Sequence, residues 1–333
     1  MAEQRFLVVR LGSLGDIVHT FPAVAGLRES FPSAHIIWLT HPRWAELVRS
    51  SQLANEIWPI DSRDNASVRQ IIGEIRSGRW TAGIDYQGLW KSALPLFFGG
   101  VRKRIGFSSK TIREYGVPIL YTDRVNCTTT HIADQNGELS LRAGARNAVG
   151  RVTLQISEAD CAHIKEILAG QSISRYVVLS PGGGWRSKCW PVERFGALCQ
   201  KIHAQLGLRC VINFGPGEDD LAAAVAAASG KAAPFACDGQ LGELMALLKS
   251  AAGIVGGDTG PLHLALALGT RAVALYGPTD PARNGPYPPQ PVVLRDAHAI
   301  TSHRRADATD PSLMRISVEE VFEAVQGMVG VQS

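Results

Sequence analysis

The feature that most constrains this chain is a regular alternation of short apolar runs with longer stretches of helical spacing. Apolar runs without polar alternation are typical of parallel strands that are buried on both faces of a sheet. The stretches between them have the apolar spacing of helices that cover such a sheet. The expected strands are Phe6–Leu11, Ile36–Thr40, Glu56–Ile60, Gly83–Tyr86, Tyr176–Ser180, Cys210–Phe214, Gly253–Val255 and Ala272–Tyr276. The expected helices include Ile17–Phe31, Ser157–Leu168, Glu193–Leu206, Asp219–Ala228, Leu241–Lys249 and Pro261–Leu268.

The same α/β plan occurs twice along the 333 residues, which predicts two domains. We expect an N-terminal domain over 1–156, a linker helix region over 157–173 and a C-terminal domain over 174–312. The segment 286–311 is rich in Pro, His and Asp and is expected to be irregular. Ser317 and Glu320 have the spacing of a capping box, which predicts a final helix within 313–333 that can pack back on the first domain.

Composition narrows the classes of function. The six cysteines contain no CxxC pair, so a zinc site or a thioredoxin-like site has no support. Scattered cysteines are typical of reduced proteins, and we expect a cytoplasmic location. No signal peptide is expected, and no apolar run approaches the length of a membrane span. Any membrane contact is therefore expected to be peripheral.

Positive charge is concentrated in the first half of the chain, although the net charge is only +4. The basic residues that lie close together there are Arg102, Lys103, Arg104, Lys110 and Arg113. Such a cluster favours an anionic partner or an anionic membrane surface, and a merely solvated face is an equally good interpretation. No nucleic-acid partner is expected.

A glycine turn with an acidic residue follows the first expected strand. Gly12 and Gly15 permit tight turning, and a helix follows them directly. The spacing is GxxG rather than GxGxxG, which argues against a dinucleotide-dependent dehydrogenase. Asp16 has two interpretations: it stabilises the first turn of its helix, or it is a general base beside a glycine-lined cleft.

A second glycine segment follows the expected strand that ends at Ser180. Three consecutive glycines, Gly183 among them, precede Lys188 and the start of a helix. Glycines leave backbone N–H groups open to phosphate oxygens, and a lysine adds a point charge. The segment is not a Walker A loop, but it favours phosphate contact over an ordinary turn.

Two further segments follow strands in the second half. Asp258, Thr259 and Gly260 precede a helix whose N-terminal N–H groups would face a bound anion, and His263 lies in its first turn. Glu218 follows another glycine turn, where it could contact ribose hydroxyls or simply begin a helix. Open α/β sheets bind ligands at the carboxyl ends of their strands. We therefore expect the donor on the second domain, with Asp16 of the first domain facing it.

Taken together, these segments resemble the bacterial lipopolysaccharide heptosyltransferases, and they look most like the heptosyltransferase I branch of that family. The matching pieces occur in family order: Arg10–Thr20, Asp85–Ala93, Lys188–Pro191, Asp258–His263 and Tyr276–Pro281. The resemblance implies the GT-B fold, in which two Rossmann-like domains face each other across a cleft. It also implies transfer of a heptose from ADP-heptose to the Kdo of lipid A.

The resemblance also implies roles for individual residues. Asp16 matches the catalytic base, and Lys188 matches the lysine that binds the diphosphate. The implied donor-binding residues are Ser180, Gly183, Lys188, Glu218, Asp258, Thr259, Gly260 and His263. The implied acceptor-binding residues are Gly15, Arg63, Gln87, Lys91, Arg113 and His131.

The implied reaction is a single inverting displacement. No DxD motif follows a strand, so no metal is expected to be essential, Mg2+ included, and no cofactor is required. A lipid A acceptor places the enzyme at the cytoplasmic face of the inner membrane. The alternatives left open are a related transferase with another nucleotide sugar or acceptor, such as heptosyltransferase II, a nucleotide-sugar epimerase of the same fold, and a binding module without catalysis.

Overall fold

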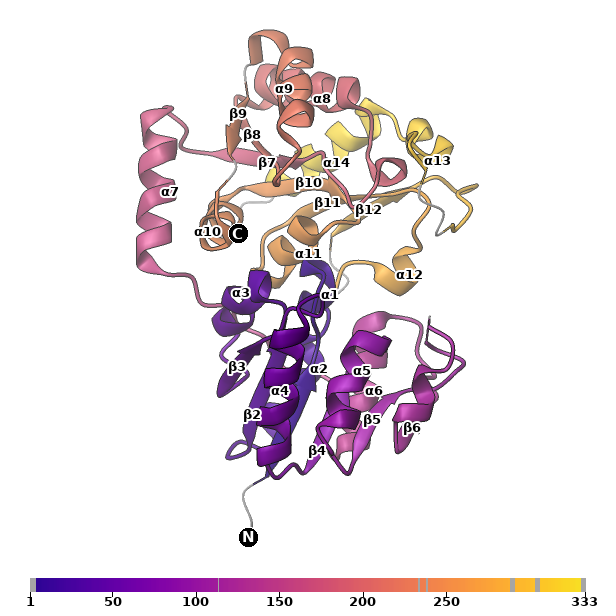
Figure 1. The fold of residues 1–333 in the computed structure, drawn as a ribbon. Helices are drawn as coiled ribbons and strands as arrows, with labels where there is room; N and C mark the ends of the chain where they lie inside the picture. Colours follow the sequence, from indigo (N-terminus) through magenta and orange to yellow (C-terminus); the bar gives the residue numbers. More distant parts are fainter. Residues whose placement is uncertain are drawn as a thin grey trace. The chain divides into compact units, whose positions relative to one another are not determined.

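The computed structural model describes residues 4–112, 114–232, 234–237, 239–287, 291–302 and 306–330. The chain divides into two compact units, Met1–Gln155 and Ile156–Ser333. Each unit is a six-stranded parallel sheet with helices on both faces, as the alternating apolar runs predict (Figure 1).

The sheet of the first unit has the strand order β3-β2-β1-β4-β5-β6. Its strands are β1 (Arg5–Val9), β2 (His35–Thr40), β3 (Glu56–Pro59), β4 (Ala82–Asp85), β5 (Arg104–Phe107) and β6 (Asp123–Val125). Its helices are α1 (Leu14–Val18), α2 (Phe21–Ser30), α3 (Ala45–Ser50), α4 (Asn65–Ser77), α5 (Trp90–Phe98) and α6 (Ile132–Ala143), with 3-10 turns η1 (Pro42–Trp44) and η2 (Val117–Leu120). Strand order reverses between β1 and β4, so the turns after these two strands meet at the point where such sheets bind ligands.

The sheet of the second unit has the order β12-β11-β10-β7-β8-β9. Its strands are β7 (Tyr176–Ser180), β8 (Arg209–Asn213), β9 (Phe235–Cys237), β10 (Gly253–Gly257), β11 (Ala272–Tyr276) and β12 (Val292–Arg295). Its helices are α7 (Glu158–Gly170), α8 (Val192–Leu206), α9 (Asp219–Ala228), α10 (Leu241–Ser250), α11 (Gly260–Ala267), α12 (Pro281–Asn284), α13 (Pro311–Arg315) and α14 (Val318–Gly330), with 3-10 turns η3 (Arg186–Lys188) and η4 (Gly230–Ala232). Order reverses between β7 and β10, and the turns after both carry glycines.

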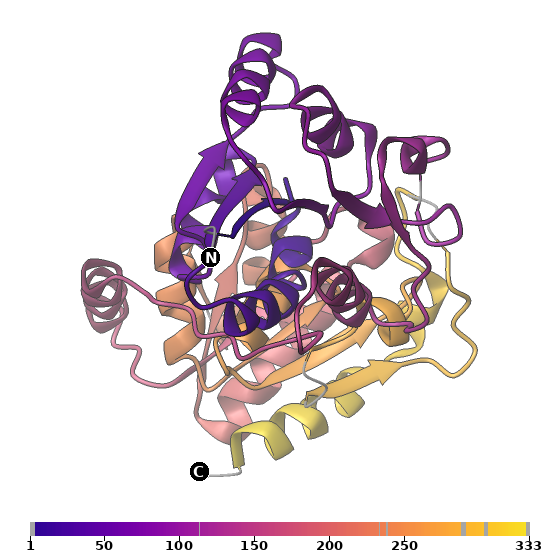
Figure 2. The same ribbon diagram turned by 90° about the horizontal axis from the view of Figure 1, so that it is seen from below.

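Helices cover both faces of each sheet. In the first unit α2 and α6 pack together on one face, and α4 and α5 pack on the other (Figures 1 and 2). In the second unit α8, α9 and α14 lie on one face, and α10 and α11 lie on the other (Figure 1). Each unit therefore has its own buried layers, which hold the strand ends in place.

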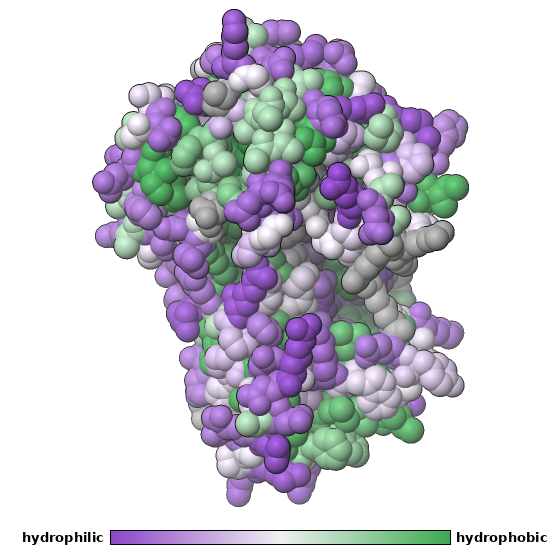
Figure 3. Space-filling model, turned by 45° about the horizontal axis from the view of Figure 1, so that its top comes forward, coloured by the Kyte–Doolittle hydropathy of each residue, from purple (hydrophilic) through white to green (hydrophobic). Residues whose placement is uncertain are grey.

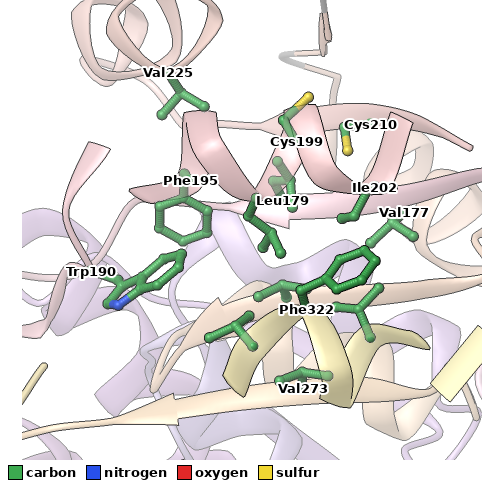
Figure 4. Packing of buried hydrophobic residues seen from close by; sticks show 14 of the residues in the cluster. Val177, Leu179, Trp190, Phe195, Cys199, Ile202, Cys210, Val225, Val273 and Phe322 are labelled. Carbon is green, nitrogen blue, oxygen red and sulfur yellow. The ribbon is translucent and has the colours of Figure 1, made fainter. Parts of the chain in front are cut away.

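The largest core cluster lies in the second unit, between its sheet and α8 with α14 (Figure 4). Trp190 and Phe195 meet edge to face with ring centroids 5.1 Å apart, and Phe322 enters the same cluster from α14. A separate cluster in the first unit joins β1 and β2 to α4 and α5.

The expected helix over Ile17–Phe31 is two helices, α1 and α2. Pro22 lies in the first turn of α2. A proline has no N–H to donate and is tolerated in a first turn, so it begins a new helix instead of continuing the old one.

The segment 286–311 was wrongly expected to be irregular throughout. Val292–Arg295 forms β12, which pairs in parallel with β11 at the edge of the sheet. Prolines on its amino-terminal side and its half-exposed position hid the strand from the apolar pattern. The strands β5, β6 and β9 were also missed, and β6 and β9 are three-residue edge strands.

The final helix packs on its own unit, and its expected packing back on the first domain stays a prediction. The buried face of α14 belongs to the core cluster of the second unit. Arg175 donates a hydrogen bond to the Val329 carbonyl at its end, at 2.8 Å. Its capping box forms as the spacing predicts, with the Ser317 backbone N–H donating to Glu320 Oε2 at 2.7 Å. Helix α7, expected as a linker, packs against α10 of the same unit.

Candidate active site

The turn after β1 presents Asp16 as a fixed, accessible carboxylate. The backbone N–H and the hydroxyl of Ser13 both donate to Asp16 Oδ2, each at 3.0 Å. The side chain of Asp16 is nevertheless 43% exposed. Both interpretations of this residue are therefore geometrically compatible, because the carboxylate closes the first turn of α1 and still faces solvent.

Arg10 is the partner of Asp16 that sequence reasoning did not identify. Arg10 Nη2 lies 2.5 Å from Asp16 Oδ1, and the Arg10 side chain is only 7% exposed. Its Nη1 donates to the backbone carbonyl of Tyr86 at the end of β4. A cation at the end of an apolar strand, directly before a glycine turn, was the available signal. This buried guanidinium fixes the position of the Asp16 carboxylate.

Gly12 gives this turn its shape. Its φ of +153° lies in a region that side chains rarely adopt, and an added Cβ would lie 2.8 Å from the Trp44 indole nitrogen. Gly15, an expected acceptor residue, is buried within α1. Gly15 can therefore contribute backbone to the site but is not an exposed contact.

The turn after β4 is tied to the turn after β1. Gln87 Oε1 accepts a hydrogen bond from the Leu11 backbone N–H at 2.7 Å, so its carbonyl oxygen holds the two turns together. Asp85 is fully buried beneath them and accepts hydrogen bonds from the Tyr121 hydroxyl at 2.7 Å and the Ser92 hydroxyl at 2.8 Å. Burial raises the pKa of Asp85, and its hydrogen bonds act against that rise.

Two histidines meet near Asp16. The rings of His19 and His131 lie edge to face with centroids 5.3 Å apart. His131 is the N-cap of α6 and accepts a hydrogen bond from the Ala133 backbone N–H at 3.2 Å. The Thr20 hydroxyl donates to the Asp16 carbonyl at 2.8 Å. The structure thus brings His131 to the helix that carries Asp16, and it adds His19, which is buried.

The other expected acceptor residues are more scattered. Lys91 is exposed near the start of α5, which follows the turn after β4. Arg63 is exposed in the turn after β3, two strands away from β1 in the sheet. Arg113 lies outside the described residues. Lys91 therefore lies on an element joined to the Asp16 turn, whereas Arg63 lies toward the edge of the sheet.

In the second unit, Lys188, Asp258 and His263 form one buried cluster. Lys188 Nζ lies 2.6 Å from Asp258 Oδ2, and His263 Nε2 lies 3.0 Å from Asp258 Oδ1. The side chains of the three residues are 11%, 8% and 4% exposed. The Lys188 ammonium also lies 4.3 Å from the centroid of the Trp185 ring. Such a cation, held at the end of β10 by a carboxylate, is placed to meet an anionic ligand.

Asp258 is held in its ionised form. Burial by itself raises the pKa of this carboxyl, but the hydrogen bond from His263 and the charges of His263 and Lys188 outweigh it. The net effect keeps the pKa of Asp258 well below its usual range. The cluster therefore keeps its negative centre, and with it the position of Lys188, at neutral pH.

Close packing of glycines brings the expected donor residues together. Gly256 pairs with the buried Ser180 across β10 and β7, and an added Cβ would lie 3.1 Å from Ser180 Cβ. A Cβ on Gly257 would lie 2.9 Å from the Lys188 carbonyl oxygen, and one on Gly183 would lie 3.1 Å from Cys189 Sγ. The strand ends approach this closely because these positions have no side chain.

Glu218 reaches the same glycine turn from β8. Its carboxylate covers the face of Gly182, where an added Cβ would clash with it. Its Oε2 accepts a hydrogen bond from the Gly215 backbone N–H at 2.8 Å. The structure thus places Glu218 beside the turn that contains Gly183, although it also begins α9 as its N-cap.

The start of α11 adds backbone N–H groups beside this cluster. Thr259 is the N-cap and Gly260 the first residue of the helix, whose initial N–H groups have no partner within the helix. Within the described part of the chain, the Thr259 hydroxyl oxygen is buried with no hydrogen-bond partner. Backbone N–H groups at a helix start, the helix dipole and a nearby lysine are groups that can meet an anionic ligand.

Two α/β units, each with charged side chains at the switch point of a parallel sheet, define a class of ligand-binding fold. The family model described as "Glycosyltransferase family 9 (heptosyltransferase)" matches residues 68–311. The chain therefore belongs to glycosyltransferase family 9, and it is a glycosyltransferase.

Curated relatives agree with this assignment. The chain is 28% identical over 300 residues to lipopolysaccharide heptosyltransferase 1 of Salmonella typhimurium, covering 85% of this chain and 91% of that one. It is 24% identical over 277 residues to lipopolysaccharide heptosyltransferase 3 of Escherichia coli, covering 80% and 81%.

Solved structures confirm the GT-B fold. A family 9 glycosyltransferase from Veillonella parvula superposes with a TM-score of 0.86 at 21% identity, over 100% of this chain and 99% of that one. The Escherichia coli heptosyltransferase WaaC with ADP superposes with a TM-score of 0.77 at 23% identity, over 98% and 100%. Among the described residues of this chain, no helix is both long and apolar enough to span a membrane.

Proposed function

We propose that this chain transfers L-glycero-D-manno-heptose from ADP-heptose to the Kdo of lipid A in the synthesis of the lipopolysaccharide inner core. The observation that carries the proposal is the buried Lys188–Asp258–His263 cluster at the switch point of the second unit. Family membership and the similarity to lipopolysaccharide heptosyltransferase 1 support the heptose and the first-heptose acceptor.

The donor binds to the second unit. Lys188 and the N–H groups at Thr259 and Gly260 contact the diphosphate, and the glycine turn at Gly183 lets its oxygens approach the backbone. Glu218 accepts hydrogen bonds from the ribose hydroxyls. The structure of the relative WaaC with ADP supports an ADP-linked donor.

Catalysis is a single displacement with inversion at the anomeric carbon. Asp16 accepts the proton of the acceptor hydroxyl while that oxygen forms a bond to the anomeric carbon. The bond from this carbon to the phosphate oxygen breaks, and its electron pair leaves with ADP. Lys188 and the start of α11 stabilise the charge that develops on the leaving diphosphate. These groups supply positive charge where a metal would, so Mg2+ is not required.

The acceptor is an anionic glycolipid that binds to the first unit at the cytoplasmic face of the inner membrane. Lys91 and His131 lie on elements next to the Asp16 turn and provide contacts of suitable polarity and charge. The amide of Gln87 retains its NH2 group for the acceptor, because only its oxygen is used to hold Leu11.

The experiment is a transfer assay with ADP-heptose and Kdo-lipid A in the presence of EDTA. Product with the inverted anomeric configuration is expected, and Asp16→Asn should lower the rate by roughly a hundredfold or more with unchanged affinity for ADP-heptose. Near-native turnover of this variant would remove Asp16 from its role. Binding of ADP-heptose without transfer to Kdo-lipid A, followed by transfer to heptosylated core, would identify a later heptosyltransferase instead.

The chain is also similar to lipopolysaccharide heptosyltransferase 3, so the test with heptosylated core as the acceptor addresses a definite alternative. Loss of activity in EDTA, restored by Mg2+, would contradict the metal-independent mechanism alone. The assay thus separates the donor, the acceptor and the metal requirement.

A further inference from the structure

An exposed aromatic and aliphatic surface lies on the first unit and has no role in the proposed chemistry. Trp90, Phe97 and Phe98 of α5 are 40%, 43% and 50% exposed, and Tyr115 and Ile119 beside η2 are 97% and 71% exposed. Figure 3 shows hydrophobic surface gathered at the lower right, on the side where α5 lies in Figure 1. We name these five residues the apolar face. Contiguous exposed apolar surface of this kind marks an interaction site.

The apolar face is one rigid surface because its two elements pack on each other. Ala93 of α5 is buried in one cluster with Val117 and Leu120 of η2. An added Cβ on Gly116 would lie 3.1 Å from the Trp90 ring, so the loop before η2 rests against that ring. The face is therefore held by the fold and does not depend on a flexible loop.

The C-terminal end of the face is held in the same way. The rings of Phe97 and Phe98 meet with centroids 5.4 Å apart. The Arg104 guanidinium lies 5.4 Å from the centroid of the Phe97 ring, and its Nε donates to the Leu120 carbonyl at 2.6 Å. Arg104 thereby joins the end of α5 to the end of η2 beneath the exposed rings.

Positive charge surrounds the apolar face. Lys91 is exposed on α5, Arg102 on the turn after α5, and Lys110 on the turn after β5. The carboxylate of Glu114 is engaged by the Trp90 backbone N–H at 2.8 Å. Lys103 belongs to another surface, because its Nζ contacts the Arg142 carbonyl at 3.4 Å. The sequence left open whether this basic cluster meets an anionic partner or only solvent, and the aromatic side chains beside it favour a partner.

We infer that the apolar face, with Lys91, Arg102 and Lys110, docks on the surface of an anionic lipid bilayer. Trp and Tyr side chains favour the interface between headgroups and acyl chains, and aliphatic and Phe side chains enter its apolar edge. Lysine and arginine meet the anionic headgroups around them. The three exposed cations Lys91, Arg102 and Lys110 supply the charge that an anionic bilayer surface attracts.

The position of the face suits the proposed glycolipid acceptor, on which its biological role rests. Helix α5 begins three residues after Gln87, at the carboxyl-terminal edge of the sheet, where Gln87 accepts a hydrogen bond from Leu11. Docking along α5 therefore brings the edge that carries Asp16 near the headgroup layer. Binding to lipid itself needs no catalysis and is tested without substrate.

The test is sedimentation of the full chain with vesicles of phosphatidylcholine alone or mixed with phosphatidylglycerol. Binding is expected only to the anionic vesicles and should weaken as salt is raised. Phe98→Ser with Ile119→Ser should weaken binding by roughly tenfold or more. Arg102→Glu with Lys110→Glu should do the same, because the charge of these two residues is reversed.

Matched controls lie in the second unit. Ile300 is 82% exposed and Lys165 is exposed on α7, so Ile300→Ser and Lys165→Glu make the same changes away from the face and should bind as the wild type does. Equal binding of wild type and both double variants would overturn the inference, as would an absence of binding to anionic vesicles. A change from oligomer to monomer in the Phe98→Ser, Ile119→Ser variant, measured by light scattering, would assign the face to a second copy of the chain and also overturn it.

Failure of the proposed function gives a different result. A chain that binds anionic vesicles but transfers no heptose keeps the docking surface and loses the proposed reaction. A chain that transfers heptose to a water-soluble Kdo acceptor but does not bind vesicles keeps the reaction and loses the docking surface.

Discussion

Arg10 and Asp16 form an ion pair of unequal exposure, and this inequality suits a catalytic carboxylate. Arg10 is buried and is also anchored to the Tyr86 carbonyl, so it cannot follow the carboxylate into solvent. Asp16 is held from one side and is open on the other. A carboxylate that is fixed in this way spends a larger fraction of its time in the orientation needed to accept a proton.

Replacing Arg10 should therefore slow transfer without weakening the donor. Arg10→Met removes the charge and keeps the length, and we expect kcat to fall by up to about a hundredfold with the dissociation constant for ADP-heptose unchanged. Arg10→Lys restores a cation and should recover part of the loss. Single-turnover transfer rates and donor titrations distinguish these effects. Wild-type kcat in Arg10→Met would show that Arg10 does not position Asp16.

Asp258 should make stability depend on pH in the acid range. Its folded pKa is depressed below the ordinary value of 3.8, so its contribution is fully present above that value and is lost as the pH falls below it. Urea unfolding from about pH 5 to pH 3 should show a steeper loss of stability in the wild type than in Asp258→Asn. Equal slopes would mean that the carboxylate is not stabilised by Lys188 and His263 in the folded state.

At the scale of the element, glycines at strand ends determine how closely the donor turns approach one another. Gly257 ends β10, and a side chain there would meet the backbone carbonyl of Lys188, which cannot move without moving η3. Ordinary turn glycines have open space around them, but this one is enclosed. The glycine is therefore part of the packing that places Lys188.

Gly257→Ala should destabilise the second unit by about 1–3 kcal/mol and weaken ADP binding. The matched control is Gly327→Ala in α14, where an added Cβ meets nothing within 4 Å. This control should be neutral or stabilising by up to about 1 kcal/mol, because alanine favours a helix over glycine. Urea unfolding and ADP titration measure both. An unchanged ADP affinity in Gly257→Ala would show that η3 can move to make room for the added methyl group.

At the scale of the whole molecule, each unit depends on its own core. The second unit is completed by the last helix of the chain, whose buried side chains lie against α8 and the sheet (Figure 4). Its strand order requires β7 and β10 to pair across more than seventy residues of intervening chain, so the donor turns meet only in the folded unit.

Phe322→Ala should therefore destabilise the second unit by about 3–5 kcal/mol. Glu323→Ala, at the neighbouring exposed position of α14, should change stability by less than about 0.5 kcal/mol. Urea unfolding followed by circular dichroism measures both. A small effect of Phe322→Ala would mean that α14 adds little to the core, and that the unit could form without it.

The sequence by itself determined eight strands (β1 to β4, β7, β8, β10 and β11), the glycine turns at the ends of several of them and the capping box at Ser317. These features are local: an apolar run, a missing side chain or a spacing of three residues specifies each one directly. The two-unit GT-B fold followed from repetition of that pattern together with the resemblance to the heptosyltransferases, and it is confirmed.

Only the tertiary structure decided which side chains meet. Strand order brings Tyr86 to Arg10 and Lys188 to Asp258, and packing of α6 brings His131 to His19. The edge strands β6, β9 and β12 were missed because they are short and partly exposed and so carry no continuous apolar run. The packing of α14 was likewise not visible in the sequence, because its partners in the core lie far away along the chain. Local pattern sets what an element is, whereas the register and order of distant elements set what its side chains contact.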